Sequence, residues 1–483
     1  MIKKSLALIM AIIMSVCSFT FTSSASGLPD YSMTDAQWAE YWEENKDNFL
    51  QMQLYVGADE SELNFCWHSE KTGDTPKVRI GLSKDMTVYT EFSGTFKKHG
   101  EWQANYVTAS GFEENEVYYY SYAVGDAAFS EPEVYRTLKS DSFKALYISD
   151  VQAGIDDDGE YATYNATCWN KVLTTALDEN DDISFILNCG DMTNSGESNL
   201  EWAATMAPKA LRNLPTTATY GNHDRKGDTY RYFVNLPNAN EALSTTPDGD
   251  EYYFRYGDVL FINLCTTNYN VFDEYNFVEK AVSENLDAKW RIVMFHHDIY
   301  GPGHHAGDDD TKLLSGVYSA ICDEFDIDVC LTGHEHYYGR SYFMYDDKVV
   351  DMDYTQHRAV DPEGTLYFTA SSAGGRNRLY DEPFDYEWLC FEYMSEELTY
   401  STIEFDEDTF SLNTYDLEGN VIDYYTIEKT SSSFNEFDKD NGLLNTNAID
   451  RLLRNYTGEY YVIFEVLYTV IDVVKSVIAS IIG

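Results

Sequence analysis

Polar side chains of types that can bind metal ions follow a series of apolar segments in this 483-residue sequence. They occur in ISDVQAG (148–154), CGDMTNSG (189–196), YGNHD (220–224), VMFHHD (293–298) and TGHEH (332–336). Carboxylate, amide and imidazole groups together form the mixed nitrogen and oxygen donor sets that suit zinc, iron or manganese. Each motif alone is also compatible with an ordinary turn or surface loop. Together, at the ends of successive apolar segments, they indicate one shared metal site.

These motifs need a sheet whose strand ends converge. Between residues 142 and 429 apolar segments alternate with helical or irregular stretches, and PTTATYGNHD (215–224) is one of the predicted strands. Parallel or mixed sheets place ligand sites at the carboxyl ends of their strands. The sequence therefore predicts an α/β domain with its site at a sheet edge, completed by three alternating segments between 400 and 428.

A different pattern precedes this domain. Residues 26–50 contain a helical spacing with an acidic first turn, which predicts a leading helical segment. Residues 51–139 contain short alternating runs separated by turn residues, which predict an all-β domain of immunoglobulin or fibronectin type. Trp67 is expected in the core of that domain.

The two ends of the chain predict an exported protein with an attached tail. Residues 1–25 combine a basic start, an apolar run and small residues, which is typical of a cleaved signal peptide; an uncleaved anchor is the alternative. We therefore expect a secreted or extracellular protein. A polar linker (430–445) leads to an amphipathic helical tail (446–483) that would lie on a membrane surface, self-associate, or pack back on the main body.

Charge and cysteine content exclude some functions. The formal net charge is −49, so the overall field repels phosphate, and we expect no nucleic acid polymer as a partner. Seven cysteines lie outside the signal, without the spacing of a disulfide framework or a zinc site. A disulfide between Cys322 and Cys330 is left open.

In this order, the motifs resemble those of the calcineurin-like metallophosphoesterase superfamily, most closely its purple acid phosphatase branch. The resemblance covers about residues 50 to 428, including a fibronectin-like domain ahead of the catalytic one. It implies a two-sheet αββα sandwich, two metal ions (iron, manganese or zinc) and a small phosphoester substrate. The reaction would be attack on phosphorus by a hydroxide that the two metals activate. Monoester and diester substrates are both left open.

The resemblance and the donor chemistry give the same ligand set. Two metal ions about 3.5–4 Å apart need a shared anionic ligand and separate outer ligands. Asp191 is the best candidate for the shared ligand because it follows a buried segment. One metal would be held by Asp191, Asn222, His296 and His334, and the other by Asp150, Asp191, His336 and Gln152.

Two positions depart from the pattern of the superfamily. Purple acid phosphatases carry a tyrosine three residues after the shared aspartate, and its phenolate gives the iron its colour; here Asn194 takes that position. Other branches have a histidine two residues after the first aspartate, where this chain has Gln152. We therefore expect a colourless protein whose first metal is Mn²⁺ or Fe²⁺, held in part by an amide oxygen.

Histidines near the ligands complete the predicted site. His223 would stabilise or protonate the leaving group, with Asp224 as the carboxylate that orients it. By resemblance, His304 or His305 would contact the phosphate; the alternative is a solvated surface pair. His297 would contact the metal ligands without binding a metal itself.

A non-catalytic cell-surface binding protein with a vestigial site is the alternative function. The departures at Gln152 and Asn194 favour it. The presence of His223 and of every ligand of the second metal favours an enzyme.

Overall fold

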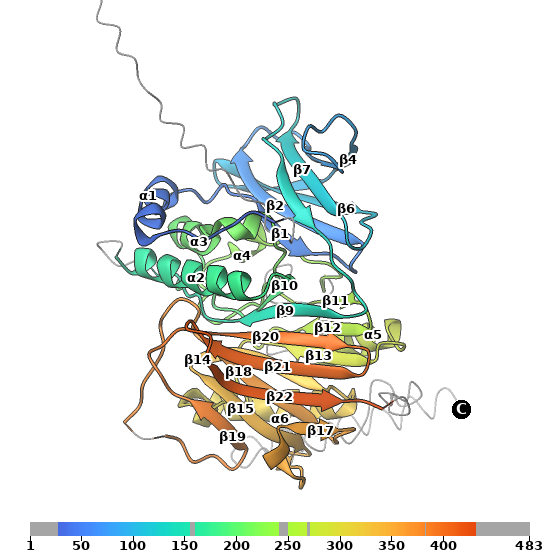
Figure 1. Ribbon diagram of the computed structural model, residues 1–483, viewed down its shortest axis with the longest axis vertical. Coiled ribbons are helices and arrows are strands. Elements are labelled where there is room, and N and C mark those ends of the chain that lie inside the picture. The colour runs from blue at the N-terminus through green and yellow to red at the C-terminus, as the bar shows by residue number, and fades with distance from the viewer. Residues whose placement is uncertain (1–27, 155–159, 241–249, 268–270, 382, 431–483) are drawn as a thin grey trace, which may run out of the picture.

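The computed structural model describes residues 28–154, 160–240, 250–267, 271–381 and 383–430 (Figure 1). The predicted signal peptide, nearly all of the linker and the predicted C-terminal tail lie outside the described residues. Within these residues, no helix has both the length and the apolar character that crossing a membrane requires.

The leading segment forms helix α1 (Asp35–Asn45), which begins with a capping box between Thr34 and Gln37. Its two buried tryptophans, Trp38 and Trp42, are four residues apart and so share one helix face. Their indole nitrogens donate to hydroxyls of helix α2 (Glu160–Glu179) at 2.9 Å. This segment is therefore fastened to the α/β domain.

Residues 53–136 form two four-stranded sheets, separate from those of the α/β domain. One has the order β1 (Gln53–Val56), β2 (Glu62–Glu70), β6 (Trp102–Ser110), β5 (Thr95–His99). The other has the order β4 (Thr90–Ser93), β3 (Pro76–Gly81), β7 (Val117–Val124), β8 (Glu133–Arg136). Trp67 is buried in the cluster between them, together with Leu54, Phe65 and Tyr120.

A six-stranded sheet holds the first two motifs. Its order is β10 (Ile183–Asn188), β9 (Phe143–Ile148), β20 (Thr399–Asp406), β21 (Thr409–Asp416), β22 (Val421–Glu428), β17 (Arg358–Val360). Strands β9 and β10 are parallel, so their carboxyl ends lie side by side. The closing strands expected between 400 and 428 are β20, β21 and β22.

An eight-stranded sheet holds the last two motifs. Its order is β11 (Tyr252–Tyr256), β12 (Val259–Asn263), β13 (Trp290–Met294), β14 (Val329–His336), β18 (Thr365–Ser371), β15 (Tyr338–Tyr345), β16 (Lys348–Val349), with β19 (Leu389–Tyr393) paired to β15. Strands β12, β13, β14 and β18 run parallel to their neighbours in that order.

The two large sheets pack face to face, and helices cover their outer faces (Figure 1). Side chains alternate along β9, with Ala145 and Tyr147 in the core between the sheets and Leu146 and Ile148 against α2. Helices α5 (Val271–Glu284) and α6 (Asp309–Glu324) cover the eight-stranded sheet. The α/β architecture is the αββα sandwich predicted from the sequence, preceded by a β-rich region.

The remaining helices are short and lie in the connections. They are α3 (Asn199–Met206), η1 (Lys209–Arg212), α4 (Tyr230–Phe233), η2 (His305–Gly307) and η3 (Tyr354–Gln356).

Two sequence-based expectations are wrong in detail. Residues 215–220, predicted as a strand, form an extended segment with isolated bridges at Thr216. Its amides at Thr217 and Thr219 donate to carbonyls of β10. The amide of Asn188, however, donates to the hydroxyl of Thr217 instead of to a carbonyl, which interrupts the ladder of main-chain hydrogen bonds. The second is the possible disulfide between Cys322 and Cys330, since both residues are free buried thiols.

Candidate metal centre

The predicted ligands lie where strands of both large sheets end. Asp150 follows β9, Asp191 follows β10 and His296 follows β13, whereas His334 and His336 lie at the end of β14. Since β9 and β10 are parallel, and β13 and β14 are parallel, each pair ends at one sheet edge. Each sheet therefore supplies part of the site.

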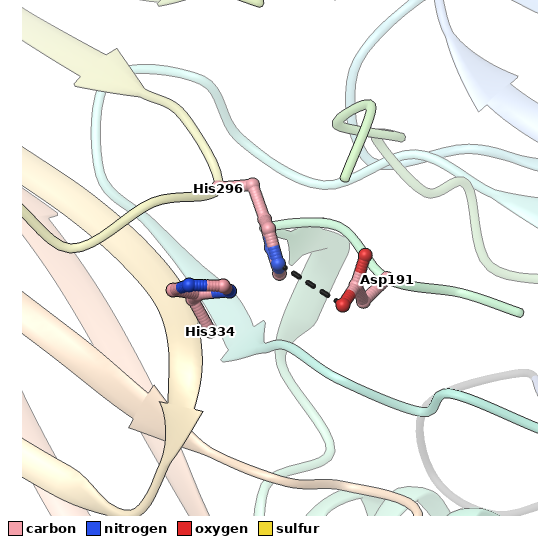
Figure 2. A group of neighbouring side chains, drawn as sticks. All are labelled: Asp191, His296 and His334. Carbon is pink, nitrogen blue, oxygen red and sulfur yellow. Dashed lines mark ion pairs between the residues drawn. The ribbon is translucent and has the colours of Figure 1, made fainter. Parts of the chain in front are cut away.

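Ligand atoms from the two sheets lie within a few ångströms of one another. Nε2 of His296 is 3.1 Å from Oδ2 of Asp191 and 4.0 Å from Oδ1 of Asp150. Nε2 of His336 is 3.3 Å from Oδ1 of Asp150. Figure 2 shows Asp191, His296 and His334, whose ligand atoms all lie within 4.8 Å of one another. This spacing is short enough for shared metal ligation.

The two histidines near Asp150 direct Nε2 toward its carboxylate. Nδ1 of His296 is 2.9 Å from the carbonyl oxygen of Cys189, and Nδ1 of His336 is 2.7 Å from that of Arg376. A carbonyl only accepts hydrogen bonds, so each Nδ1 carries the proton. In a neutral ring Nε2 is then an acceptor, which is the arrangement of metal-binding histidines.

Several predicted ligands have buried atoms without hydrogen-bond partners in the described part of the chain. They are Oδ1 of Asp150, Oε1 of Gln152, Oδ2 of Asp191, Oδ1 of Asn222 and Nε2 of His296. Each buried acceptor left unsatisfied costs about 1–3 kcal/mol, and more when it is charged. Their grouping in one place is explained if cations satisfy them together, so the donor set fits the two metals that the sequence predicts.

The backbone adopts a sparsely populated conformation at the same residues. Positive φ angles occur at Asp150 (53°), Gln152 (38°), Asp191 (46°), His334 (77°) and His336 (65°). A left-handed conformation is uncommon for residues with a Cβ, and such strain clusters at functional sites. The conformation turns these side chains out of the strand direction toward the site.

Two glycines make room for the carboxylates. A Cβ on Gly221 would lie 2.0 Å from Oδ1 of Asp191, and one on Gly333 would lie 2.5 Å from Oδ2 of Asp150. Both glycines precede a predicted ligand, in GNHD and GHEH. Their absence of a side chain lets the loops from different strands approach within hydrogen-bonding distance.

The carboxylates of Asp191 and Asp150 stabilise a positive charge on His296. Burial opposes ionisation of Asp191, but His296 and His223 hold the pKa of this carboxyl well below its usual value. Burial likewise opposes a charged His296, yet Asp191 and Asp150 raise its pKa to about 10. Either a proton or a metal ion can supply that charge, and metal binding displaces the proton. For His334, burial and the neighbouring His297 and His296 depress the pKa and keep the ring neutral.

Asp224 does not have the role expected from the sequence. Its carboxylate accepts from the amides of Met192, Thr193 and Gly221 and from the hydroxyl of Thr193, at 2.9–3.2 Å. Burial and the charge of Asp191 raise its pKa to about 7 against the effect of these donors. Asp224 thus joins the Asp191 loop to the GNHD turn rather than orienting the ring of His223.

The main chain of Asn194 takes the place of that carboxylate. Nδ1 of His223 lies 3.0 Å from the carbonyl oxygen of Asn194. The main-chain amide of His223 donates to Oδ1 of Asp191. The side-chain oxygen of Asn194 accepts from Nη1 of Arg376 at 3.2 Å. His223 is therefore held beside Asp191, the predicted shared ligand, and the side chain of Asn194 is bonded to Arg376.

The histidines after the fourth motif divide into supporting and exposed groups. Nδ1 of His297 pairs with the hydroxyl of Thr266 at 2.6 Å, which agrees with a supporting role. The side chain of His304 is 60% exposed. The ring of His305 lies 4.5 Å from that of His334, but its Nδ1 pairs with Asp308 and its Nε2 with Arg378. Both nitrogens of His305 are thus occupied, which argues against its predicted contact with phosphate.

Sequence reasoning missed Arg376 and Arg378. They lie in the sequence GGRNR (374–378), in the loop after β18. Strand β18 is paired with β14, which carries two of the predicted ligands. The available signal was a pair of cations at the end of an apolar segment in a chain with 33 basic and 82 acidic residues. No motif connected this segment to the metal ligands, since their proximity depends on the fold.

Comparison with known proteins agrees with the geometry. The family model of the calcineurin-like phosphoesterases matches residues 143–338, which include every predicted metal ligand. Purple acid phosphatase PPD1 from seeds of yellow lupin (Lupinus luteus) has a similar structure, with a TM-score of 0.62 and 15% identity over 79% of this chain and 74% of that chain. PhoD is similar with a TM-score of 0.50 and 11% identity, over 84% of this chain and 98% of that chain. No curated protein matches the sequence.

The site and the match define the class of the protein. Residues 143–338 match the calcineurin-like phosphoesterase family model, and the fold is like that of purple acid phosphatase. The match and the clustered donor residues support a metal-dependent phosphoesterase.

Proposed function

We propose that the protein is a secreted hydrolase of small phosphoric esters that uses two metal ions and His223. The N-terminal sequence supports export. The observation that carries the proposal is that five predicted ligands, namely Asp150, Gln152, Asp191, Asn222 and His296, each have a buried polar atom without a hydrogen-bond partner among the described residues.

Two cations bound at this site would neutralise the phosphoryl oxygens and lower the pKa of an attacking water. The protein residues supply the positions. Asp150 and Asp191 bring carboxylate oxygens from one sheet, and His296, His334 and His336 bring imidazole nitrogens from the other. The donors are pre-oriented by their outer hydrogen bonds, so little reorganisation accompanies binding.

His223 would serve the leaving group. Its main chain is bonded to Asp191 and its Nδ1 to a carbonyl oxygen, so the proton on Nδ1 is fixed and Nε2 is the atom left to act. In the charged form, Nε2 can donate a proton to the departing oxygen. General acid catalysis of this kind contributes about 10²–10⁴-fold.

The test is hydrolysis of para-nitrophenyl phosphate by purified protein supplied with Mn²⁺, Fe²⁺ or Zn²⁺. His223→Ala should lower kcat by about 10²-fold or more while metal content, measured by elemental analysis, stays unchanged. His357→Ala is the matched control because His357 is partly exposed and its ring stacks on Tyr424. Equal rates for wild type and His223→Ala would reject the proposal and favour a binding protein with a vestigial site.

A further inference from the structure

A cleft of about 700 Å³, called here the junction cleft, lies where three parts of the chain meet. The leading segment contributes Tyr31 and Tyr41, strand β7 contributes Tyr119 and Tyr122, and η1 contributes basic side chains. None of the described residues that line it is a predicted metal ligand. Clefts of this size at the junction of domains are typical of sites for small organic molecules.

The junction cleft reverses the charge balance of the chain. Its lining contains one acidic side chain, Glu133, and three basic ones, Lys84, Lys209 and Arg212. The whole sequence contains 33 basic and 82 acidic residues. A concave surface that gathers positive charge attracts anions and raises their local concentration. The cleft is therefore suited to an anionic ligand, in a protein whose overall charge repels anions.

Arg212 carries a charge that no bonded carboxylate neutralises. Its hydrogen-bond partners are uncharged: the carbonyl oxygens of Met52, Met206 and Pro208, the amide oxygen of Gln51 and the hydroxyl of Tyr41. Glu133 lines the same cleft, but no ion pair joins it to Arg212 within the described part of the chain. Neutral partners orient the guanidinium and leave its charge available to a ligand.

Hydrogen bonds hold two of the aromatic walls in place. The hydroxyl of Tyr31 donates to Oδ1 of Asn213 at 2.9 Å, and the hydroxyl of Tyr41 donates to the carbonyl oxygen of Ala207 at 3.0 Å. Nζ of Lys209 lies 4.4 Å from the centre of the Tyr41 ring. The walls are thus ordered before a ligand binds, which lowers the entropy cost of binding.

Other side chains of the junction cleft are not engaged in holding the fold. Lys84 is exposed and Tyr119 is half-buried, and neither side chain has a hydrogen-bond or ion-pair partner among the residues that the structure describes. A cation and an aromatic ring at the wall of a cleft, both without partners, are groups that a ligand can use.

We propose that the junction cleft binds an acidic saccharide. Its carboxylates would be bound by the basic side chains, because guanidinium and ammonium groups form charge-assisted hydrogen bonds with carboxylate. Its sugar rings would pack their C–H faces on the tyrosine rings, which combine apolar area with a polar hydroxyl. The amides of Asn48 and Asn213 line the same cleft and can bond to sugar hydroxyls. Such a site attaches the protein to an acidic polysaccharide, independently of the metal centre.

A purely structural role is the competing explanation. Arg212 bonds to Met52, just before β1, and to Met206, at the end of α3, so it also fastens the leading segment to the α/β domain. If the charges and tyrosines of the cleft served only this purpose, Lys84 and Tyr119 would contribute nothing to ligand binding. These two residues are therefore the decisive arms of the test.

The experiment is calorimetric titration of the full-length protein with digalacturonate. Cellobiose is the neutral saccharide and acetate is the carboxylate without a sugar. The variants are Lys84→Gln, Tyr119→Ala, Glu133→Gln and Arg212→Gln, with thermal unfolding as a check on folding. Lys348→Gln and Tyr345→Ala are the matched controls, because both residues lie outside the cleft and are partly exposed.

Wild type should bind digalacturonate about tenfold more tightly than cellobiose or acetate. Lys84→Gln and Tyr119→Ala should each weaken this binding by about threefold, and Arg212→Gln by about tenfold or more. Glu133→Gln should strengthen it by about threefold, because the substitution removes the one acidic group of the cleft. The two control variants should bind like wild type.

Three results would overturn the inference. They are no binding of digalacturonate at millimolar concentration, equal affinity for digalacturonate and either cellobiose or acetate, and unchanged affinity in both Lys84→Gln and Tyr119→Ala. The gain expected for Glu133→Gln cannot arise from misfolding. If Arg212→Gln does not fold, the other three variants therefore still decide the outcome.

Discussion

The main-chain amide of His223 donates a hydrogen bond of 2.9 Å to Oδ1 of Asp191. The other oxygen of this carboxylate, Oδ2, faces His296 at 3.1 Å. One oxygen therefore fixes the turn that carries the proposed acid, and the other is directed at the metal ligands. Any displacement of Asp191 would move His223 as well, so the positions of the proposed metal ligand and of the proposed acid are coupled.

Asp224→Asn should loosen this arrangement. The oxygen of the new amide can still accept from one set of these donors, but its NH2 group cannot accept from the main-chain amides that the other carboxylate oxygen satisfies. We expect a loss of about 1–3 kcal/mol in the free energy of unfolding, measured by urea denaturation, and weaker metal binding. Asp353→Asn, in an exposed turn, is the control with a smaller expected effect. Unchanged stability and metal content would show that Asp224 does not fasten the loops.

Gln152→His should tighten the first metal. Oε1 of Gln152 is a buried acceptor without a partner in the described residues, and imidazole is a stronger ligand than an amide oxygen. We expect metal affinity at this site to rise about tenfold, equivalent to 1.4 kcal/mol. Competition with a chelator measures it, with Gln356→His on the exposed η3 as control. An unchanged affinity would remove Gln152 from the ligand set.

The iron-loaded protein should be colourless. Asn194 occupies the position of the colour-giving tyrosine, and its side chain is bonded to Arg376. Visible absorption spectra should show no charge-transfer band in wild type, whereas Asn194→Tyr should acquire one if the phenolate reaches the metal. A band in the wild-type spectrum would contradict the ligand assignment.

Acid should weaken the attachment of the N-terminal sheets. His68 is buried against His99 and Phe233, and burial together with His99 lowers its pKa to about 3. The unfolded chain takes up a proton near pH 6.5 whereas the native ring does not, so stability falls as pH drops below 6.5. The loss at pH 5 relative to pH 7 should be about 2 kcal/mol.

Thermal unfolding across this pH range checks the prediction for His68. A His68→Gln variant should show a flatter pH dependence, whereas His357→Gln, at a partly exposed position, should follow wild type. Identical pH profiles for wild type and His68→Gln would contradict the assignment.

The sequence was most informative where a buried strand ends in a polar motif. Asp150, Asp191, His296, His334 and His336 could be placed together because parallel strands bring their carboxyl ends to one edge. The extended segment at 215–220 was mistaken for a strand because its apolar pattern does not reveal that the hydroxyl of Thr217 occupies an amide of β10.

The role of each side chain within the site was harder to predict. Asp224 was predicted to orient the ring of His223 because the two residues are adjacent in the chain. A left-handed turn at Asp191 instead directs main-chain donors to the carboxylate of Asp224. Arg376 and Arg378 were missed because their partners, Asn194 and His305, are distant in sequence. Such contacts follow from loop conformation, for which a single sequence carries little signal.

The division of ligands between the two sheets has a consequence for how the protein assembles. Aspartates from the six-stranded sheet and histidines from the eight-stranded sheet converge only when the layers are correctly stacked. A partly folded chain with one sheet formed would offer an incomplete set of donors. Tight metal uptake would thus be a late event in folding, and bound metal would lock the layers against sliding apart.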